Sequence, residues 1–328
     1  MESLITTIIP TYRRPYMLRK AILSVLDQTY SHFQVCVYDN ASGDETSDIV
    51  AEIARKDPRV KYHCHHANIG AVGNFNYGMK QVKTPYFSFL SDDNTLLPGF
   101  YEDALNTLNQ YPEAVFIAGK TIGVNKKGKN YGGASLDCWE AGLIYPPEGL
   151  LNIIENGSPI LEGVLFRSKV LNDVGLFDPT YHGAIDQDFM LRISRNNIFY
   201  ISKRKYAVYL YHENSWQENR ELREFVATRK KLLQKWCQDP GLSDDIKRRI
   251  KKMLKKYIER IITDVVVKKC ILGEDNATLI LAAEVMKKEI GFSFKSYRTI
   301  TVARYVNYNR LLKKLVQMCF YLYIHRKK

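Results

Sequence analysis

The stretch Tyr86-Phe87-Ser88-Phe89-Leu90-Ser91-Asp92-Asp93-Asn94 decides how the chain is interpreted, because a short apolar run leads directly into two adjacent carboxylates. The apolar part is typical of a buried strand. Adjacent carboxylates on a turn repel one another unless a positive charge such as a divalent cation neutralises them. The alternative is that Asp92 or Asp93 caps the helix expected after Pro98.

Apolar runs and helical stretches alternate on both sides of this segment. Met17, Ile22 and Leu26 recur at helical spacing, and Asp44 begins a second expected helix. The strands expected from the sequence are 4–9, 33–38, 60–64, 86–90, 114–124 and 161–166, and later helices are expected at 168–174 and 186–195. This alternation predicts an α/β fold with a sheet flanked by helices.

Polar residues follow each early strand. They lie at 10–14, 39–44, 68–70 and 91–94. Ligands bind at the carboxyl ends of the strands in open α/β sheets, so donors and acceptors are expected to converge there.

Together these segments resemble the inverting GT-A glycosyltransferases of the large nucleotide-sugar-dependent family, of the family 2 type, over roughly residues 4–216. The resemblance rests on Ile8-Ile9-Pro10-Thr11-Tyr12-Arg13-Arg14, on Tyr38-Asp39-Asn40-Ala41-Ser42-Gly43-Asp44 and on Leu90-Ser91-Asp92-Asp93-Asn94. It implies a GT-A catalytic domain at residues 1–217, a Rossmann-like mixed sheet flanked by helices. A smaller basic α-helical domain is expected at residues 218–328.

The resemblance also implies roles for single residues. Binding of the nucleotide-sugar would fall to Pro10, Tyr12, Arg14, Asp39, Asn68, Gly70, Asn76 and Asp92. Asp93 and His212 would hold Mn²⁺ or Mg²⁺, ions that suit oxygen-rich sites open to phosphates. Ser91 and Asn94 stand where the family often has Asp, a departure that bears on metal affinity.

The general base is expected at the start of the helix near residue 186. Ile185 replaces the first acid of the family's acidic pair, so Asp186 takes the role by alignment, with Asp188 as the second candidate. The alternative is that Asp186 only caps that helix. His182 and Trp216 are the expected acceptor contacts.

These roles predict direct displacement at the anomeric carbon with inversion. A carboxylate accepts the proton of the attacking hydroxyl, and the cation stabilises the departing diphosphate. The favoured donor is a UDP-sugar, and the acceptor is a glycan, a lipid-linked sugar or a surface polymer. The alternative in this fold is a sugar nucleotidyltransferase, which would need a Gly-rich signature with a Lys where residues 11–14 offer none.

The net charge of +13 is unevenly distributed. Residues 220–328 contain 27 Lys and Arg against 11 Asp and Glu, and seven cations lie within residues 247–256 beside an apolar stripe. Such a surface is a solvated helix face, or it attracts an anionic membrane or another polyanion. A membrane or acceptor contact is the favoured interpretation, an oligomer contact is possible there, and nucleic-acid binding is the alternative from another class.

The six cysteines are far apart and form no CxxC pair, which fits a reducing compartment. The first residues lack the features of a secretory signal. We therefore expect a cytoplasmic protein that can lie on the inner face of the cell membrane.

Overall fold

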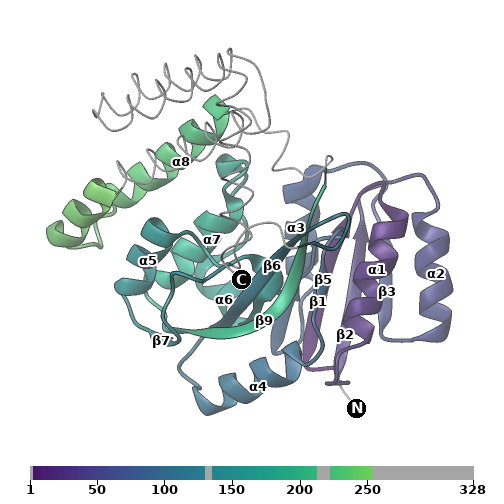
Figure 1. Ribbon diagram of the computed structural model, residues 1–328. Coiled ribbons are helices and arrows are strands. Elements are labelled where there is room, and N and C mark those ends of the chain that lie inside the picture. The colour runs from purple at the N-terminus through teal and green to yellow at the C-terminus, as the bar shows by residue number, and fades with distance from the viewer. Residues whose placement is uncertain (1–2, 130–134, 213–221, 254–328) are drawn as a thin grey trace, which may run out of the picture. The chain divides into compact units, whose positions relative to one another are not determined.

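The computed structural model describes residues 3–129, 135–212 and 222–253. The chain divides into two compact units, Met1–Glu218 and Asn219–Lys328. The first unit is built on one mixed sheet with the strand order β3-β2-β1-β4-β8-β6-β9-β5, in which β7 also pairs with β9 (Figure 1). This architecture confirms the predicted mixed sheet flanked by helices.

The first four strands run parallel to one another. They are β1 (Ile5–Thr11), β2 (Phe33–Asp39), β3 (Val60–Cys64) and β4 (Tyr86–Phe89), connected by α1 (Pro15–Leu26), α2 (Thr46–Lys56) and α3 (Gly70–Lys80). Thr11 pairs with Asp39 at the last position of the β1–β2 register. The polar segments that follow β1 and β2 therefore begin side by side at one edge of the sheet.

The second half of the sheet is mixed. Its strands are β5 (Thr95–Leu96), β6 (Phe116–Asn125), β7 (Gly142–Ile144), β8 (Val164–Arg167) and β9 (Phe199–Tyr211). β8 runs antiparallel to both β4 and β6, whereas β6 and β9 are parallel. The long strand β9 also pairs antiparallel with β5 and β7, so it joins three other strands.

Among the described residues, four further helices and two 3₁₀ turns belong to the first unit. They are α4 (Phe100–Gln110), α5 (Glu148–Asn156), η1 (Leu161–Gly163), α6 (Lys169–Val174), η2 (Pro179–Tyr181) and α7 (Ile185–Ser194). The expected strand at 161–166 was therefore wrong at its start, because residues 161–163 form a 3₁₀ turn in which the side chain of Glu162 is buried.

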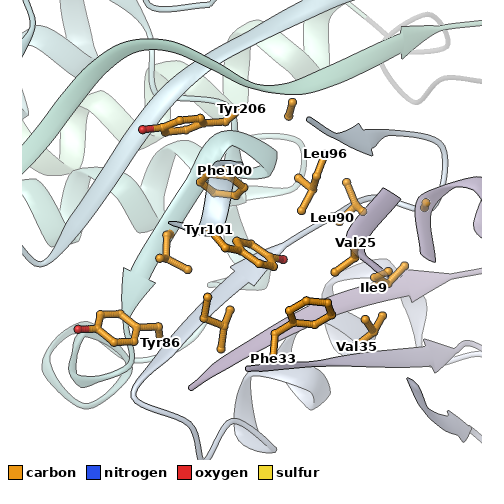
Figure 2. Packing of buried hydrophobic residues seen from close by; sticks show 14 of the residues in the cluster. Ile9, Val25, Phe33, Val35, Tyr86, Leu90, Leu96, Phe100, Tyr101 and Tyr206 are labelled. Atoms are coloured by element: carbon orange, nitrogen blue, oxygen red, sulfur yellow. The ribbon is translucent and has the colours of Figure 1, made fainter. Parts of the chain in front are cut away.

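Alternate residues of each strand face two different cores, because successive side chains point to opposite faces. One core joins Ile9, Phe33 and Val35 of the strands to Val25 of α1 and Tyr101 of α4 (Figure 2). The other is rich in stacked and edge-on aromatic rings. It contains Phe75, Phe87, Phe89, Phe116, Phe166, Phe177, Phe189 and Phe199. Both cores fix the sheet whose edge carries the polar segments.

The second unit is described for residues 222–253. It contains α8 (Leu222–Cys237), and its buried side chains are Leu232, Leu233, Trp236, Leu242 and Ile250. No helix among the described residues is both long and apolar enough to cross a membrane. That residues 218–328 form one basic helical domain stays a prediction, because residues 254–328 lie outside the described part.

Candidate active site

The ends of β1 and β2 are fixed to each other by their backbones. Arg13 and Ala41 both have positive φ angles, 54° and 60°, which non-glycine residues adopt uncommonly. The N–H of Asn40 donates to the carbonyl of Thr11 (3.0 Å), and the N–H of Arg13 donates to Ser42 Oγ (2.8 Å). Strained backbone held by neighbouring bonds is typical of ligand sites.

Asp39 is buried at the end of β2 and accepts hydrogen bonds at both carboxylate oxygens. Ser42 donates to Oδ1 from its backbone N–H (3.0 Å) and its hydroxyl (2.5 Å), and Tyr62 Oη donates to Oδ2 (2.7 Å). These donors fix the direction of a carboxylate that can accept from an N–H group of a base. Nearby, Pro10 is half-buried and Tyr12 is 39% exposed.

Asp92 is buried beneath the β1 segment. Its Oδ2 accepts from Thr11 Oγ1 (2.8 Å) and from the N–H of Tyr12 (3.4 Å), and its Oδ1 accepts from Arg14 Nη1 (3.0 Å). Burial raises the pKa of Asp92 to about 6, although the Arg14 guanidinium opposes the shift. Helix α4 begins after Gly99 and has no side-chain cap, so the interpretation of Asp92 or Asp93 as its cap is wrong.

Asp93 lies between two groups that carry or can carry positive charge. Its Oδ2 is 2.7 Å from Arg14 Nη1 and 3.0 Å from Nε2 of the buried His212, which follows the last residue of β9. The structure thus brings together four of the predicted residues, Arg14, Asp92, Asp93 and His212.

Asp93 Oδ2 and His212 Nε2 are atoms of kinds that can ligate a divalent cation. Their separation of 3.0 Å is that of a hydrogen bond, and it also equals the distance between ligand atoms at neighbouring corners of an octahedron with bonds of about 2.1 Å. Among the described residues no three His, Cys, Asp or Glu side chains converge on one point. Phosphate oxygens and water usually complete the shell of an ion that one or two protein side chains hold.

Glu162 of η1 is a polar neighbour of this turn that the sequence reasoning missed. Its Oε1 accepts from Ser91 Oγ and from Asn94 Nδ2, both at 2.7 Å, and burial raises its pKa. Asn94 in turn accepts from the N–H of Leu210 in β9 (2.9 Å). A Glu within the otherwise apolar run 160–166 was the signal that could have identified it.

The other predicted donor-side residues form two separate contacts. Asn68 Oδ1 accepts from Asn40 Nδ2 and from the N–H of Gly70, both at 2.9 Å, where Gly70 begins α3 with a φ of 77°. The side-chain amide of Asn76 both donates to and accepts from the backbone of Phe177 at 2.9 Å. Asn76 therefore joins α3 to the segment that precedes α7.

The two candidate bases occupy different surroundings on α7. Asp186 lies half-buried in the first turn, after the capping position Ala184, and its Oδ1 accepts from the N–H of Gln187 (2.8 Å). It is therefore not the capping residue. Asp188 is fully buried and accepts from Arg192 Nε (2.7 Å), whose guanidinium also donates to the carbonyls of Val174 and Leu176.

The described residues include only one of the two expected acceptor contacts. His182 is exposed and immediately follows η2. Trp216 lies outside the described residues.

The comparisons with known proteins identify glycosyltransferases. Residues 6–175 match the model of Glycosyl transferase family 2. The chain is 30% identical over 211 residues to an uncharacterized glycosyltransferase of Rickettsia bellii, covering 61% of this chain and 29% of that protein. It is 36% identical over 107 residues to the GalNAc(5)-diNAcBac-PP-undecaprenol β-1,3-glucosyltransferase of Campylobacter jejuni, covering 32% and 33%. The chain thus spans about a third of these relatives' length.

Solved structures share the fold at low sequence identity. Residues 1–349 of TarS from Staphylococcus aureus, in complex with UDP-GlcNAc, superpose with a TM-score of 0.65 at 18% identity, covering 98% of this chain and 92% of that one. The mannosyltransferase PcManGT from Pyrobaculum calidifontis, in complex with GDP-Man and Mn²⁺, gives a TM-score of 0.57 at 15% identity, covering 99% and 86%. At these identities the likeness shows the fold.

Proposed function

Because the chain belongs to glycosyl transferase family 2, we propose that it transfers a sugar from a nucleotide diphosphate-sugar to an acceptor hydroxyl with inversion. The observation that carries the proposal is the convergence of Asp92, Asp93, Arg14 and His212 at the carboxyl end of the sheet. Opposite charges held this close provide contacts for both a cation and a diphosphate.

On the donor side, Asp93 and His212 are the residues that would hold Mn²⁺ or Mg²⁺. When bound, the ion supplies a Lewis acid for the departing diphosphate. Asp92 holds Arg14 beside the turn, and the Arg14 guanidinium can contact a phosphate oxygen.

The nucleobase is assigned to the Asp39 segment. Asp39 offers carboxylate acceptors and Pro10 and Tyr12 lie on the adjacent strand end, an arrangement that suits the N–H group of a uracil. A UDP-sugar is the favoured donor, and the complex of TarS with UDP-GlcNAc supports this choice by similarity of fold. Asn68, Gly70 and Asn76 would support this side by fixing the start and the position of α3.

On the acceptor side, Asp186 is the proposed general base. As the acceptor oxygen attacks the anomeric carbon, its proton passes to the Asp186 carboxylate and the bond to the diphosphate oxygen breaks on the opposite face. The burial of Asp188 and its pairing with Arg192 favour a structural role for it. His182, exposed before α7, and Trp216 are the proposed acceptor contacts.

The proposed acceptor is a glycan or lipid-linked sugar, in line with the undecaprenol-linked substrate in the name of the Campylobacter jejuni relative. The basic residues after position 218 would place the enzyme on an anionic membrane surface, on the cytoplasmic side. Lys251→Glu with Lys252→Glu should weaken binding to vesicles containing phosphatidylserine, because each cation contributes about 1 kcal/mol near such a surface. Equal binding by the variant, or a stronger preference for single-stranded DNA, would contradict this placement.

The central test is a donor panel. Purified protein is incubated with UDP-, GDP- and dTDP-sugars, with Mn²⁺ or with EDTA, and nucleotide release and thermal stability are measured. We expect one donor class to be turned over and to raise the melting temperature, since a ligand that binds only the native state stabilises it. The proposal fails if no nucleotide-sugar binds to the protein and none reacts when extracts that contain glycan or lipid-linked acceptors are added.

The alternative of a sugar nucleotidyltransferase gains no support from the site. In the described chain, β1 is followed by Tyr12, Arg13 and Arg14 and by no Gly-rich loop with a Lys.

A further inference from the structure

Glu162 is a buried carboxylate that the proposed chemistry does not use. Its residue is 6% exposed, and its Oε1 takes two hydrogen bonds of 2.7 Å from Ser91 and Asn94. Those two residues flank Asp92 and Asp93 in the sequence. A single carboxylate oxygen therefore holds both ends of the acidic turn.

The position of Glu162 is itself tightly constrained. A Cβ atom on Gly163 would lie 2.7 Å from the carbonyl oxygen of Gly119 and 3.0 Å from Thr121 Oγ1, both in β6. The backbone of η1 thus packs directly against β6, which leaves no room for a larger residue. Glu162 extends from this fixed support rather than from a mobile loop.

Asn94 extends the connection to a third segment. While its Nδ2 donates to Glu162, its Oδ1 accepts from the backbone N–H of Leu210 (2.9 Å). Leu210 precedes His212 by two residues, and His212 Nε2 is 3.0 Å from Asp93 Oδ2. The bonds made by Glu162 and Asn94 therefore join the turn that carries Asp93 to the strand that leads to His212.

The chemistry of the flanking residues matches the carboxylate. Ser91 and Asn94 can donate, whereas an Asp at either position would place a second buried negative charge against Glu162. The neutral residues of the turn and the acid of η1 form one complementary set.

We propose that Glu162 is a positioning residue of the transfer site. Through Ser91 and Asn94 it holds the acidic turn against β9 and so sets the separation of Asp93 and His212. This inference rests on the proposed function, because the spacing matters where those two residues hold a cation.

A double-mutant cycle tests the proposal. Glu162→Leu removes the oxygen that accepts from Ser91 and Asn94, and Asn94→Asp puts a carboxylate against Glu162, so each of these variants should bind Mn²⁺ about tenfold more weakly, as expected when the support of a ligand is disturbed. Glu162→Gln keeps a carbonyl oxygen that can accept both bonds, so its Mn²⁺ affinity should stay close to that of the wild type. In the double variant Glu162→Gln with Asn94→Asp, the amide introduced at position 162 can donate to the carboxylate introduced at position 94 while its carbonyl oxygen accepts from Ser91, so most of the affinity lost in Asn94→Asp should return. Mn²⁺ binding is measured by titration calorimetry, and UDP binding in EDTA should change less than twofold.

Asp103→Leu is the matched control for Glu162→Leu. Asp103 also accepts from two side chains, Arg204 and Tyr206, but it lies on α4, away from the acidic turn. This variant should alter the melting temperature without altering Mn²⁺ affinity. Unchanged Mn²⁺ affinity in Glu162→Leu, or no recovery of affinity when Glu162→Gln is added to Asn94→Asp, would overturn the proposal.

A second readout separates this proposal from the proposed function. The imidazole nitrogen shifts of His212, observed by NMR without metal, should move in Glu162→Leu and in Asn94→Asp, and should return toward the wild-type values when Glu162→Gln is added to Asn94→Asp. If the wild type bound no Mn²⁺, the metal-dependent function would fail, while these shifts would still test the positioning. Identical His212 shifts in wild type and Glu162→Leu would refute it.

Discussion

The acidic turn at residues 91–94 and the start of α7 at residues 182–186 both carry carboxylates assigned to the reaction, but they are built differently. In the turn, all four side chains make hydrogen bonds, to residues of β1, η1 and β9 or to His212 just after β9. At the start of α7, the Asp186 carboxylate accepts only from the adjacent N–H of Gln187 within the described chain, and His182 is exposed.

This difference agrees with the substrate that we propose for each region. A diphosphate and a cation have fixed geometry, and preorganised charges stabilise their developing charge without reorganisation. A base must instead contact a hydroxyl that arrives with the acceptor, so its oxygens have to stay accessible. The braced turn suits the donor, and the more open start of α7 suits the acceptor.

The largest effect is expected from the open region. Asp186→Asn removes the proposed base but keeps its size, so kcat should fall by about 10²–10⁴-fold with little change in donor KM. The measurement is steady-state transfer together with donor binding by calorimetry. A near-normal kcat would show that Asp186 is not the general base. The structural difference between the two regions would then not reflect different roles in the reaction.

The next effect tests the braced region. Asp93→Ala takes away the carboxylate shared by Arg14 and His212, and kcat should fall by about 10²–10³-fold, in the range found when one preorganised electrostatic contact is lost. Mn²⁺ affinity and circular dichroism are measured in parallel. A variant that keeps its fold, its Mn²⁺ affinity and its turnover would contradict the assignment.

Asp188→Asn sharpens the comparison within α7, because the same chemical change is made two residues from Asp186. Weakening the buried pair with Arg192 should lower the free energy of unfolding by about 3 kcal/mol. Activity per folded molecule should change little, as seen by active-site titration below the melting temperature. If Asp188→Asn instead abolished turnover without lowering the free energy of unfolding, Asp188 would be the general base and Asp186 the structural residue.

The smallest effect is expected at the base-binding segment. Tyr62→Phe removes one of the donors that orient Asp39, and a hydrogen bond of about 1 kcal/mol corresponds to a rise in donor KM of about fivefold. Tyr86→Phe is the matched control. Tyr86 is the first residue of β4, at the opposite end of that strand from the acidic turn, and its Oη accepts a hydrogen bond from Arg167. Equal changes in both variants would point to general destabilisation.

The parallel half of the fold and its polar strand ends could be predicted because their signals are local. Strands β1, β2 and β4 are short, largely apolar runs, and the turns that follow contain their own polar residues. The site was recognisable for the same reason: Asp92 and Asp93 are adjacent in the chain.

The rest of the fold and of the candidate site depends on contacts between residues that are far apart in the sequence. Strands β5 and β7 are two and three residues long and exist by pairing with β9, so no local pattern marks them. Glu162 is 68 residues from Asn94, and its role becomes visible only once η1 packs on β6. The expected strand at 161–166 failed at its start for this reason, since burial of a carboxylate is not encoded in apolar spacing.

The contact between Asn76 and Phe177 has a consequence for how such enzymes diversify. Asn76 recognises only main-chain atoms, so it anchors the segment before α7 whatever side chains that segment carries. Residues 178–184 could then be exchanged between relatives as a cassette, changing the sugar that is extended while nucleotide selection is inherited unaltered. A chimaera carrying another member's cassette should retain the parental affinity for its nucleotide.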